Sequence, residues 1–552
     1  MQSDGPILPL FHPLVQRWFS RTFSAPTEIQ RGAWEAISRG DHALLCAPTG
    51  SGKTLAAFLW SIHRYLSGRA SGRTLYISPL KALNNDISRN LRTPLEQIRR
   101  LATEESPESD PLPEIRIGLR SGDSSSSERA RIMRNPPEIF ITTPESVNIM
   151  LTSEGGRRNL SDIDTVILDE IHVVAGSKRG SLLMANIERL EALCSTSAPD
   201  GLQRIGLSAT VRPLESVAAF LGGFAGDNSP RPVSIIRDGE KRRYELELKL
   251  GERVGEGWWD RQIPLLAEEI NSHESTLIFC NSRRAAEKTA YLLNERFGEK
   301  VVFAHHGSLS REYRYWVEQQ LKDGALKAVV ATSSLELGID VGSIDRVIQL
   351  QAPFSVSSAV QRIGRANHQV GGSSSALFAP LHPRDIAKSL AVMGEIFDGD
   401  IEPLLIPERP LDVLAQIILS ECAGRRIPEA GLSALLRQSY PFRDLGSEEF
   451  DSVLEMLAGK YQNTRIAELG QRIIRNRDEG WIEGREGLRQ LIYQSGGTIP
   501  DRGYFDLRIA GSNEKLGELD EEFVFERSLG DRISIGNRVW QIEDMDNQRV
   551  VV

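Results

Sequence analysis

The residues best suited to chemistry lie in the string APTGSGKTLAAF, residues 47–58. A short apolar run precedes this glycine-rich turn and a helical pattern follows it. Glycines let backbone N–H groups curl around phosphate oxygens, and the start of a helix adds a favourable field. Lys53 would then pair with the β- and γ-phosphates, and the Thr54 hydroxyl would bind Mg²⁺. The residues predicted to hold a nucleotide in this turn are Thr49, Gly50, Ser51, Gly52, Lys53 and Thr54.

Ala47 departs from the full phosphate-binding pattern, which has a glycine at that position. A string of this length also arises by chance, and its simpler interpretation is a glycine loop that caps a helix. The place of the turn, between a strand and an apolar helix, favours phosphate binding.

A second string, VILDEIHVV at residues 166–174, places two carboxylates at the end of an apolar run. Ionised carboxylates that enter an apolar core are costly unless something compensates their charge. Alone, such a pair is more often a solvated turn. In the same sheet as a phosphate-binding loop, Asp169 would hold Mg²⁺ and Glu170 would polarise the attacking water. His172 has no second His or Cys at zinc-ligand spacing, so we interpret it as a polar link between the site and its surroundings.

Length, composition and charge set the broad class of the protein. Of 552 residues, 40% are hydrophobic and 26% charged, as in globular proteins of three or four domains. The net charge of −9 argues against coating nucleic acid by bulk electrostatics, but it is compatible with a local basic groove. The four cysteines include no C-x-x-C pair, which disfavours zinc, an iron–sulfur cluster and a disulfide framework. With no signal-peptide pattern and no long apolar run, we expect a cytoplasmic protein without a membrane partner.

Two series of short apolar runs predict two parallel sheets. Such runs alternate with helical patterns over residues 1–225, and the alternation repeats over residues 226–385. This spacing is typical of βαβ units, so we predict two doubly wound α/β domains with a linker near residues 222–245. Ligands of such sheets bind outside the carboxyl ends of the strands, where the motifs lie. The predicted strands are 42–48, 74–79, 115–119, 139–144, 165–170 and 204–210, and then 276–281, 300–306, 328–333, 346–351 and 375–380.

The sequence pattern changes after residue 385. Helical periodicity dominates residues 386–495, and residues 496–552 contain short strand-like runs. We expect a helical domain followed by a β-rich module. The predicted strands of the module are 504–511, 522–528, 531–536, 538–545 and 548–552.

The motifs, in their order along the chain, resemble those of superfamily 2 helicases. PTEIQ resembles the motif that places a glutamine, here Gln30, on adenine. SPLKALNND and TTPES resemble motifs that grip a nucleic-acid strand, and SAT resembles the motif that couples hydrolysis to strand movement. ATSSLELGIDVG and QRIGRANH resemble motifs that complete the ATP site from a second domain. The resemblance implies two tandem RecA-like domains with ATP and Mg²⁺ as cofactors.

The same resemblance implies roles for residues of the second domain. Arg365 is the first choice for the arginine that stabilises the transferring phosphoryl group, and Arg362 is the second. The choice stays open because His368 stands where the superfamily commonly has another arginine. Asp340 resembles the residue that reaches the ribose. The residues implied to contact the nucleic-acid strand are Thr143, Ser146, Thr332 and His306.

Four strings narrow the resemblance to the Lhr group of large helicase-related proteins: DEIHVVAGSKRG, AHHGSLSRE, QRIGRANHQVGG and SGGTIPDRG. In that group residues 386–495 would be a winged-helix domain, and members usually continue well beyond residue 552. The resemblance implies a nucleoid-associated motor that moves 3′-to-5′ on single-stranded DNA and unwinds duplex DNA or RNA:DNA hybrids in DNA repair.

Two alternatives stay beside the DNA helicase hypothesis. One is an RNA-remodelling helicase, because a two-domain motor can grip the backbone of either nucleic acid. The other is a binding scaffold with an inactive ATP site. The scaffold is disfavoured because the residues needed for hydrolysis are all present, namely Lys53, Thr54, Asp169, Glu170 and Arg365.

Overall fold

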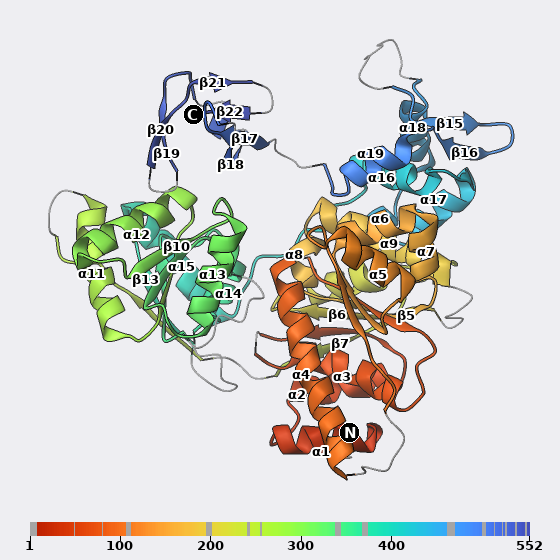
Figure 1. The fold of residues 1–552 in the computed structure, drawn as a ribbon, viewed down its shortest axis with the longest axis horizontal. Coiled ribbons are helices and arrows are strands. Elements are labelled where there is room, and N and C mark those ends of the chain that lie inside the picture. The colour runs from red at the N-terminus through yellow and green to blue at the C-terminus, as the bar shows by residue number, and fades with distance from the viewer. Residues whose placement is uncertain are drawn as a thin grey trace. The chain divides into compact units, whose positions relative to one another are not determined.

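The computed structural model divides into two compact units, residues 1–239 with 403–499 and residues 240–402 with 500–552 (Figure 1). No helix among the described residues is both long and apolar enough to cross a membrane. The described residues are 8–48, 50–79, 81–105, 112–194, 201–239, 243–253, 257–336, 344–366, 374–460, 470–499, 504–512, 514–520, 523–524, 527–535, 538–546 and 549–552.

The first unit contains a seven-stranded parallel sheet in the order β3-β4-β2-β5-β6-β1-β7. All six strands predicted for this part of the chain are present. The strands are β1 (His42–Cys46), β2 (Arg73–Ile77), β3 (Ile117–Arg120), β4 (Ile139–Thr142), β5 (Ile163–Leu168), β6 (Gln203–Ser208) and β7 (Val233–Arg237).

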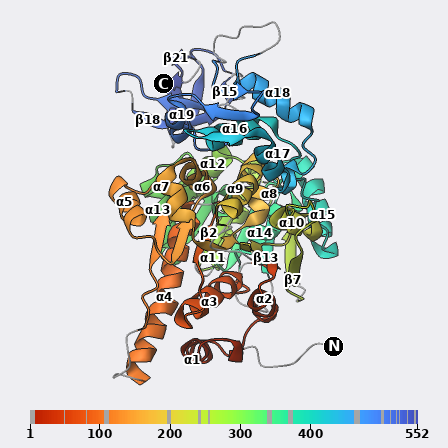
Figure 2. The same cartoon turned by 90° about the vertical axis from the view of Figure 1, so that its right-hand side faces the viewer.

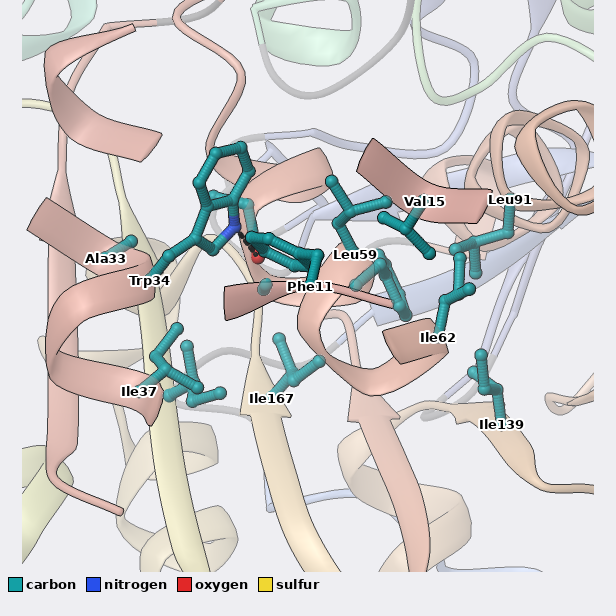
Figure 3. Packing of buried hydrophobic residues seen from close by; sticks show 14 of the residues in the cluster. Phe11, Val15, Ala33, Trp34, Ile37, Leu59, Ile62, Leu91, Ile139 and Ile167 are labelled. Atoms are coloured by element: carbon teal, nitrogen blue, oxygen red, sulfur yellow. Dashed lines mark hydrogen bonds between the residues drawn. The ribbon is translucent and has the colours of Figure 1, made fainter. Parts of the chain in front are cut away.

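Helices cover both faces of this sheet, as buried apolar side chains on alternate faces require. On one face the Trp34 indole donates a hydrogen bond to the Ala56 carbonyl at 2.9 Å, within the apolar cluster that Figure 3 shows. The helices of that face are α1 (Pro13–Thr22), α2 (Glu28–Ser38), α3 (Lys53–Leu66) and α4 (Lys81–Glu105), after the short η1 (Leu8–Leu10). Those of the other face are α5 (Ser126–Arg134), α6 (Pro144–Thr152), α7 (Glu154–Leu160), α8 (Ile171–Ala175), α9 (Lys178–Cys194) and α10 (Leu214–Gly222).

The second unit contains a six-stranded parallel sheet in the order β10-β11-β9-β12-β13-β8. The five strands predicted here are all present. The strands are β8 (Tyr244–Leu248), β9 (Thr276–Phe279), β10 (Val302–His305), β11 (Ala328–Ala331), β12 (Arg346–Leu350) and β13 (Ser374–Ala379). The helices are α11 (Trp258–Ser272), α12 (Arg283–Phe297), α13 (Arg311–Lys322), η2 (Ser333–Leu335), α14 (Val356–Ile363) and α15 (Pro383–Asp398).

The segment predicted as a linker, residues 222–245, contributes an edge strand to each sheet. β7 pairs with β1 in the first sheet, and β8 pairs with β13 in the second. The first sheet therefore extends past residue 225. In the second unit, α15 extends past residue 385 and packs on α14 and β8.

Residues 403–499 combine helices with a small antiparallel sheet of order β14-β16-β15, the arrangement expected of a winged helix. Figures 1 and 2 both show α16 lying beside α9 of the first sheet's helical layer. The two parts share one apolar cluster, which includes Leu182 and Ala185 of α9. The elements are α16 (Leu411–Cys422), β14 (Arg426–Pro428), α17 (Glu429–Arg437), η3 (Tyr440–Phe442), α18 (Ser447–Leu457), β15 (Ile473–Asn476), β16 (Trp481–Gly484) and α19 (Leu488–Gln494).

The C-terminal residues form the expected β-rich module, within the second unit. The sequence analysis does not predict β18, and it predicts a strand over 522–528, where the described residues 523–524 are helical. The strands are β17 (Tyr504–Arg508), β18 (Lys515–Asp520), β19 (Arg532–Ile535), β20 (Arg538–Gln541), β21 (Asp544–Met545) and β22 (Arg549–Val551).

We call residues 1–239 the first lobe and residues 240–402 the second lobe. A buried ion pair joins the winged helix to the first lobe. The Arg189 guanidinium of α9 donates to the Glu421 carboxylate of α16, and both side chains are almost fully buried. Arg189 also donates to the side-chain oxygens of Asn148, at 3.0 Å, and Asn186, at 2.6 Å. A buried cation with this many partners has a strict geometric requirement, because each lost partner leaves charge uncompensated.

Replacing Glu421 with alanine should therefore destabilise the first unit by about 3–5 kcal/mol, the typical effect of leaving a buried charge without its partner. The matched control is Glu154→Ala, which removes an exposed pair with Arg158 on α7 and should change stability by less than about 1 kcal/mol. Denaturant unfolding followed by tryptophan fluorescence measures both effects. Equal small losses in the two variants would show that the ion pair does not hold the winged helix.

Candidate nucleotide and nucleic-acid site

The strand order of the first sheet brings the predicted motifs of the first lobe to one edge. β6 lies between β1 and β5, and all three strands are parallel. The glycine-rich turn follows β1, SAT follows β6 and the carboxylate pair follows β5. Motifs that are far apart in the sequence therefore meet at the carboxyl ends of neighbouring strands, where ligands of such sheets bind.

The glycine-rich turn is held open by backbone conformation and by α2. Gly52 has φ +87° and precedes the first residue of α3, so the N-terminal amides of that helix face the turn. A Cβ atom at Gly52 would lie 2.5 Å from the Gln30 side-chain nitrogen, so a side chain there would displace the end of Gln30, and the positive φ also favours glycine. The Thr27 hydroxyl donates to the Ser51 carbonyl at 3.0 Å, and Gln30 completes the capping box of α2. Gln30, predicted to contact adenine, thus lies directly against the turn.

Lys53 folds back onto the turn. Its ammonium group donates to the Pro48 carbonyl at 2.7 Å and also to the Ala47 carbonyl. These carbonyls hold a cation at the N-terminus of α3, where the helix field favours an anion. Thr54 is half-buried in the first turn of α3. Thr49, also predicted to bind the nucleotide, lies outside the described residues.

The two carboxylates at the end of β5 are buried and close together. Glu170 has φ +46°, a left-handed conformation that is uncommon for a residue with a side chain. The Asp169 carboxylate accepts a hydrogen bond from the Glu170 N–H at 2.9 Å and another from the Tyr76 hydroxyl. Burial, and then the neighbouring Glu170 charge, raise the pKa of Asp169 from its ordinary 3.8 to about 7. The protein by itself thus leaves negative charge at this position only partly compensated.

These residues fit a divalent cation bound with phosphates. Two carboxylates and the Thr54 hydroxyl supply the hard oxygen atoms that Mg²⁺ prefers. The raised pKa of Asp169 reflects carboxylate charge that a cation would neutralise. When bound, Mg²⁺ would supply neutralisation of phosphate charge, and Asp169 and Thr54 are the residues that would hold it.

His172 connects the carboxylate pair to SAT. Its Nδ1 atom accepts a hydrogen bond from the Ala209 N–H at 3.2 Å and lies 3.6 Å from a Glu170 carboxylate oxygen. Burial lowers the pKa of the imidazole, which keeps it neutral. Its Nε2 atom is buried without a hydrogen-bond partner among the described residues. This geometry agrees with the interpretation of His172 as a polar link.

The residues predicted to contact nucleic acid have mixed environments. In the first lobe Thr143 and Ser146 are buried at the start of α6, and their hydroxyls lie 3.1 Å apart. In the second lobe Thr332 is half-buried after β11. His306 is buried, and its Nε2 atom lies 2.9 Å from a Glu287 carboxylate oxygen, so the ring is directed to a protein partner. The four assignments stay predictions.

The two candidate arginines of the second lobe differ in their partners. Arg362 pairs with the Glu336 carboxylate at 3.0 Å, and its guanidinium lies over the Phe279 ring. Arg365 is also buried, but it donates to the Glu336 backbone carbonyl at 2.9 Å. Arg362 is thus held by a carboxylate within its own lobe. Asp340 and His368 lie outside the described residues.

Family profiles match three stretches of the chain. The DEAD/DEAH box helicase family matches residues 27–217, and the helicase conserved C-terminal domain matches residues 261–368. The winged helix domain of the large helicase-related protein matches residues 394–552. The chain belongs to the Lhr group of DEAD/DEAH box helicases. The predicted fold class, two RecA-like domains with a winged helix and a β-rich module, is confirmed.

Relatives of the Lhr group resemble the chain along nearly all its length. Lhr helicase/probable uracil glycosylase of Mycolicibacterium smegmatis is 42% identical, covering 98% of this chain and 38% of the relative. ATP-dependent helicase Lhr-Core of Methanothermobacter thermautotrophicus is 39% identical, covering 98% and 63%. A solved structure of Mycobacterium smegmatis helicase Lhr bound to ssDNA and AMP-PNP is 43% identical with a TM-score of 0.82, covering 91% of this chain and 64% of that one. The chain spans less than two thirds of each of these proteins.

Sequence reasoning did not identify two residues that shape the site, Tyr76 and Glu336. Tyr76 lies in the middle of the predicted strand 74–79, and a buried tyrosine usually needs a partner for its hydroxyl. Glu336 lies in ATSSLELGIDVG, within the motif that was assigned to the ATP site as a whole. Their partners, Asp169 and Arg362, are 93 and 26 residues away in the chain, so no local pattern indicates them.

Replacing Asp169 with asparagine should stabilise the protein when nucleotide and metal are absent. The folded-state pKa near 7 lies above the ordinary 3.8, so ionising Asp169 opposes folding, increasingly as the pH rises from about 4 to 7. The variant should therefore melt about 2–5 °C higher than the wild type at pH 8, and the difference should vanish near pH 4. Thermal unfolding in EDTA tests this, with Glu154→Gln on the exposed surface of α7 as the control. A difference that does not depend on pH would show that the Asp169 charge is already compensated.

Proposed function

We propose that the chain is an ATP-dependent helicase that couples ATP hydrolysis, with Mg²⁺, to movement along single-stranded DNA. One observation carries the proposal. Lys53, Asp169 and Glu170 lie at the carboxyl ends of strands that flank β6, with SAT between them and His172 bonded to it. Phosphate-binding and water-activating groups are thus connected to the motif that, by resemblance, transmits hydrolysis to the strand.

The roles of the residues follow from their chemistry. The amides at the start of α3 and Lys53 bind phosphate oxygens, and Glu170 orients and polarises the attacking water. Arg365 acts as the arginine finger, while Arg362 is held by Glu336 and maintains the fold of the second lobe. Thr143, Ser146, Thr332 and the loop of His306 contact the strand backbone, and Asp340 reaches the ribose.

The choice of DNA is supported by the relatives. The solved Lhr structure that resembles the chain holds ssDNA, and two relatives are described as both helicase and uracil glycosylase, or probable uracil glycosylase. We extend the proposal to 3′-to-5′ movement, unwinding of DNA duplexes and RNA:DNA hybrids, and a nucleoid-associated role in DNA repair. Remodelling of RNA is the alternative function.

Replacing Glu170 with glutamine should lower kcat for ATP hydrolysis by about 10²–10⁴-fold, because the water loses its general base. Binding of a fluorescent ATP analogue should be retained, since an amide of the same size preserves the geometry. The comparison variant Lys53→Ala should lose both nucleotide binding and hydrolysis. Hydrolysis at the wild-type rate in Glu170→Gln would show that another group activates the water.

ATPase stimulation by matched single strands should separate the two nucleic-acid hypotheses. We expect single-stranded DNA to stimulate hydrolysis by more than RNA of the same length and sequence. Unwinding of duplexes with a 3′ or a 5′ tail, and with DNA or RNA in either strand, then measures direction and substrate. Equal or greater stimulation by RNA would favour the alternative function.

A further inference from the structure

The strand next to the carboxylate pair supplies a side chain that no motif includes. Tyr76 lies on β2, which pairs with β5 so that Tyr76 is in register with Ile167. Its side chain is fully buried and stacks on Phe58 of α3, with ring centroids 4.8 Å apart. Its hydroxyl donates to Oδ2 of Asp169. Tyr76 thus touches both the helix of the glycine-rich turn and the predicted metal ligand.

The remaining contacts of Asp169 define one orientation of its carboxylate. Oδ1 accepts the Glu170 N–H at 2.9 Å, and the Asp169 N–H donates to the Ile77 carbonyl at 2.9 Å. The backbone of Asp169 is therefore fixed by β2, and each carboxylate oxygen has one hydrogen bond. Without the Tyr76 hydroxyl, the orientation of the carboxylate would depend, among the described contacts, on the Glu170 N–H alone.

The end of β2 also reaches a predicted nucleic-acid motif. The Ser78 N–H donates to the Thr142 carbonyl at 3.0 Å, next to Thr143. Ser78 itself begins SPLKALNND, the other motif that resembles a strand grip. The end of β2 thus joins the Asp169 carboxylate to the elements expected to hold a nucleic-acid strand. The residues that do so are consecutive: Tyr76 and Ile77 of β2, and Ser78 directly after it.

We propose that Tyr76 is a positioning residue of the nucleotide site: its hydroxyl orients the Asp169 carboxylate for the metal that accompanies ATP. The inference rests on the proposed function and adds a residue to its site. In this contact the phenol O–H is the donor and the carboxylate oxygen is the acceptor. The described side-chain contacts of Tyr76 include the predicted metal ligand Asp169, so we expect its effect in metal dependence before nucleotide affinity.

The test is Tyr76→Phe, which removes one oxygen atom and keeps the ring on Phe58. The matched control is Tyr65→Phe on the same helix as Phe58. The Tyr65 hydroxyl donates to the Glu138 carbonyl at 2.7 Å and accepts from the Thr74 N–H at 3.0 Å, at the amino end of β2, whereas the carboxylate pair follows the carboxyl end of β5. We expect the Mg²⁺ concentration at half-maximal ATPase rate to rise about tenfold in Tyr76→Phe and to stay unchanged in Tyr65→Phe. Mg²⁺-dependent tightening of a fluorescent ATP analogue should weaken by a similar factor.

A thermal-stability cycle tests the contact without metal or activity. In the wild-type background, Tyr76→Phe should lower the melting temperature, because Asp169 loses a hydrogen bond. In an Asp169→Ala background the same change should be neutral or stabilising, because the hydroxyl then has no acceptor and its burial is costly. This comparison stays informative even if Tyr76→Phe hydrolyses ATP poorly.

The outcomes separate this inference from the proposed function. An unchanged Mg²⁺ requirement in Tyr76→Phe, with hydrolysis still lost in Glu170→Gln, would overturn the role of Tyr76 and leave the helicase proposal intact. Equal effects of Tyr76→Phe in both stability backgrounds would overturn it as well. Wild-type hydrolysis in Lys53→Ala and Glu170→Gln would instead overturn the proposed function.

Discussion

Two adjacent carboxylates at the end of the central strand of an apolar sheet are the constraint on which this structure depends. β5 is the fourth of seven strands, and Asp169 and Glu170, directly after it, are 7% and 9% exposed. Little water reaches them to compensate their charge, and the described partners of Asp169 are a phenol hydroxyl and one backbone N–H, with the Lys53 charge nearby. The site is therefore electrostatically incomplete without a cation, which is a physical reason for nucleotide and metal to bind together.

The same strand connects the site to the winged helix. The carboxylate pair directly follows β5, and α8 begins directly after the pair. The next helix, α9, packs against α16 through a shared apolar cluster. The buried Arg189–Glu421 pair fixes the register of that contact. The end of the first sheet that carries the motifs and the winged helix thus belong to one compact unit, connected through packed helices. A chain of packed helices of this kind can transmit a conformational change between the motif end of the sheet and the winged helix.

Two buried arginines of the second lobe, Arg362 and Arg365, contact Glu336 in different ways. The Glu336 carboxylate forms an ion pair with Arg362, and the Glu336 backbone carbonyl accepts a hydrogen bond from Arg365. Both contacts depend on Glu336, which is 26 residues from Arg362 and 29 from Arg365 in the chain, so only the tertiary structure brings the three residues together.

The sequence by itself determined the eleven predicted strands of the two sheets and the chemistry of their ends, because strand runs, glycine turns and adjacent carboxylates are local patterns. It did not indicate β7, β8 and β18, whose residues include charged or alternating side chains typical of partly exposed strands. Only the tertiary structure decided the strand order that places β6 between β1 and β5, the contact of Tyr76 with Asp169, and the packing of the winged helix on α9. Those features join residues tens to hundreds of positions apart, and such pairings depend on how whole faces pack rather than on any local spacing.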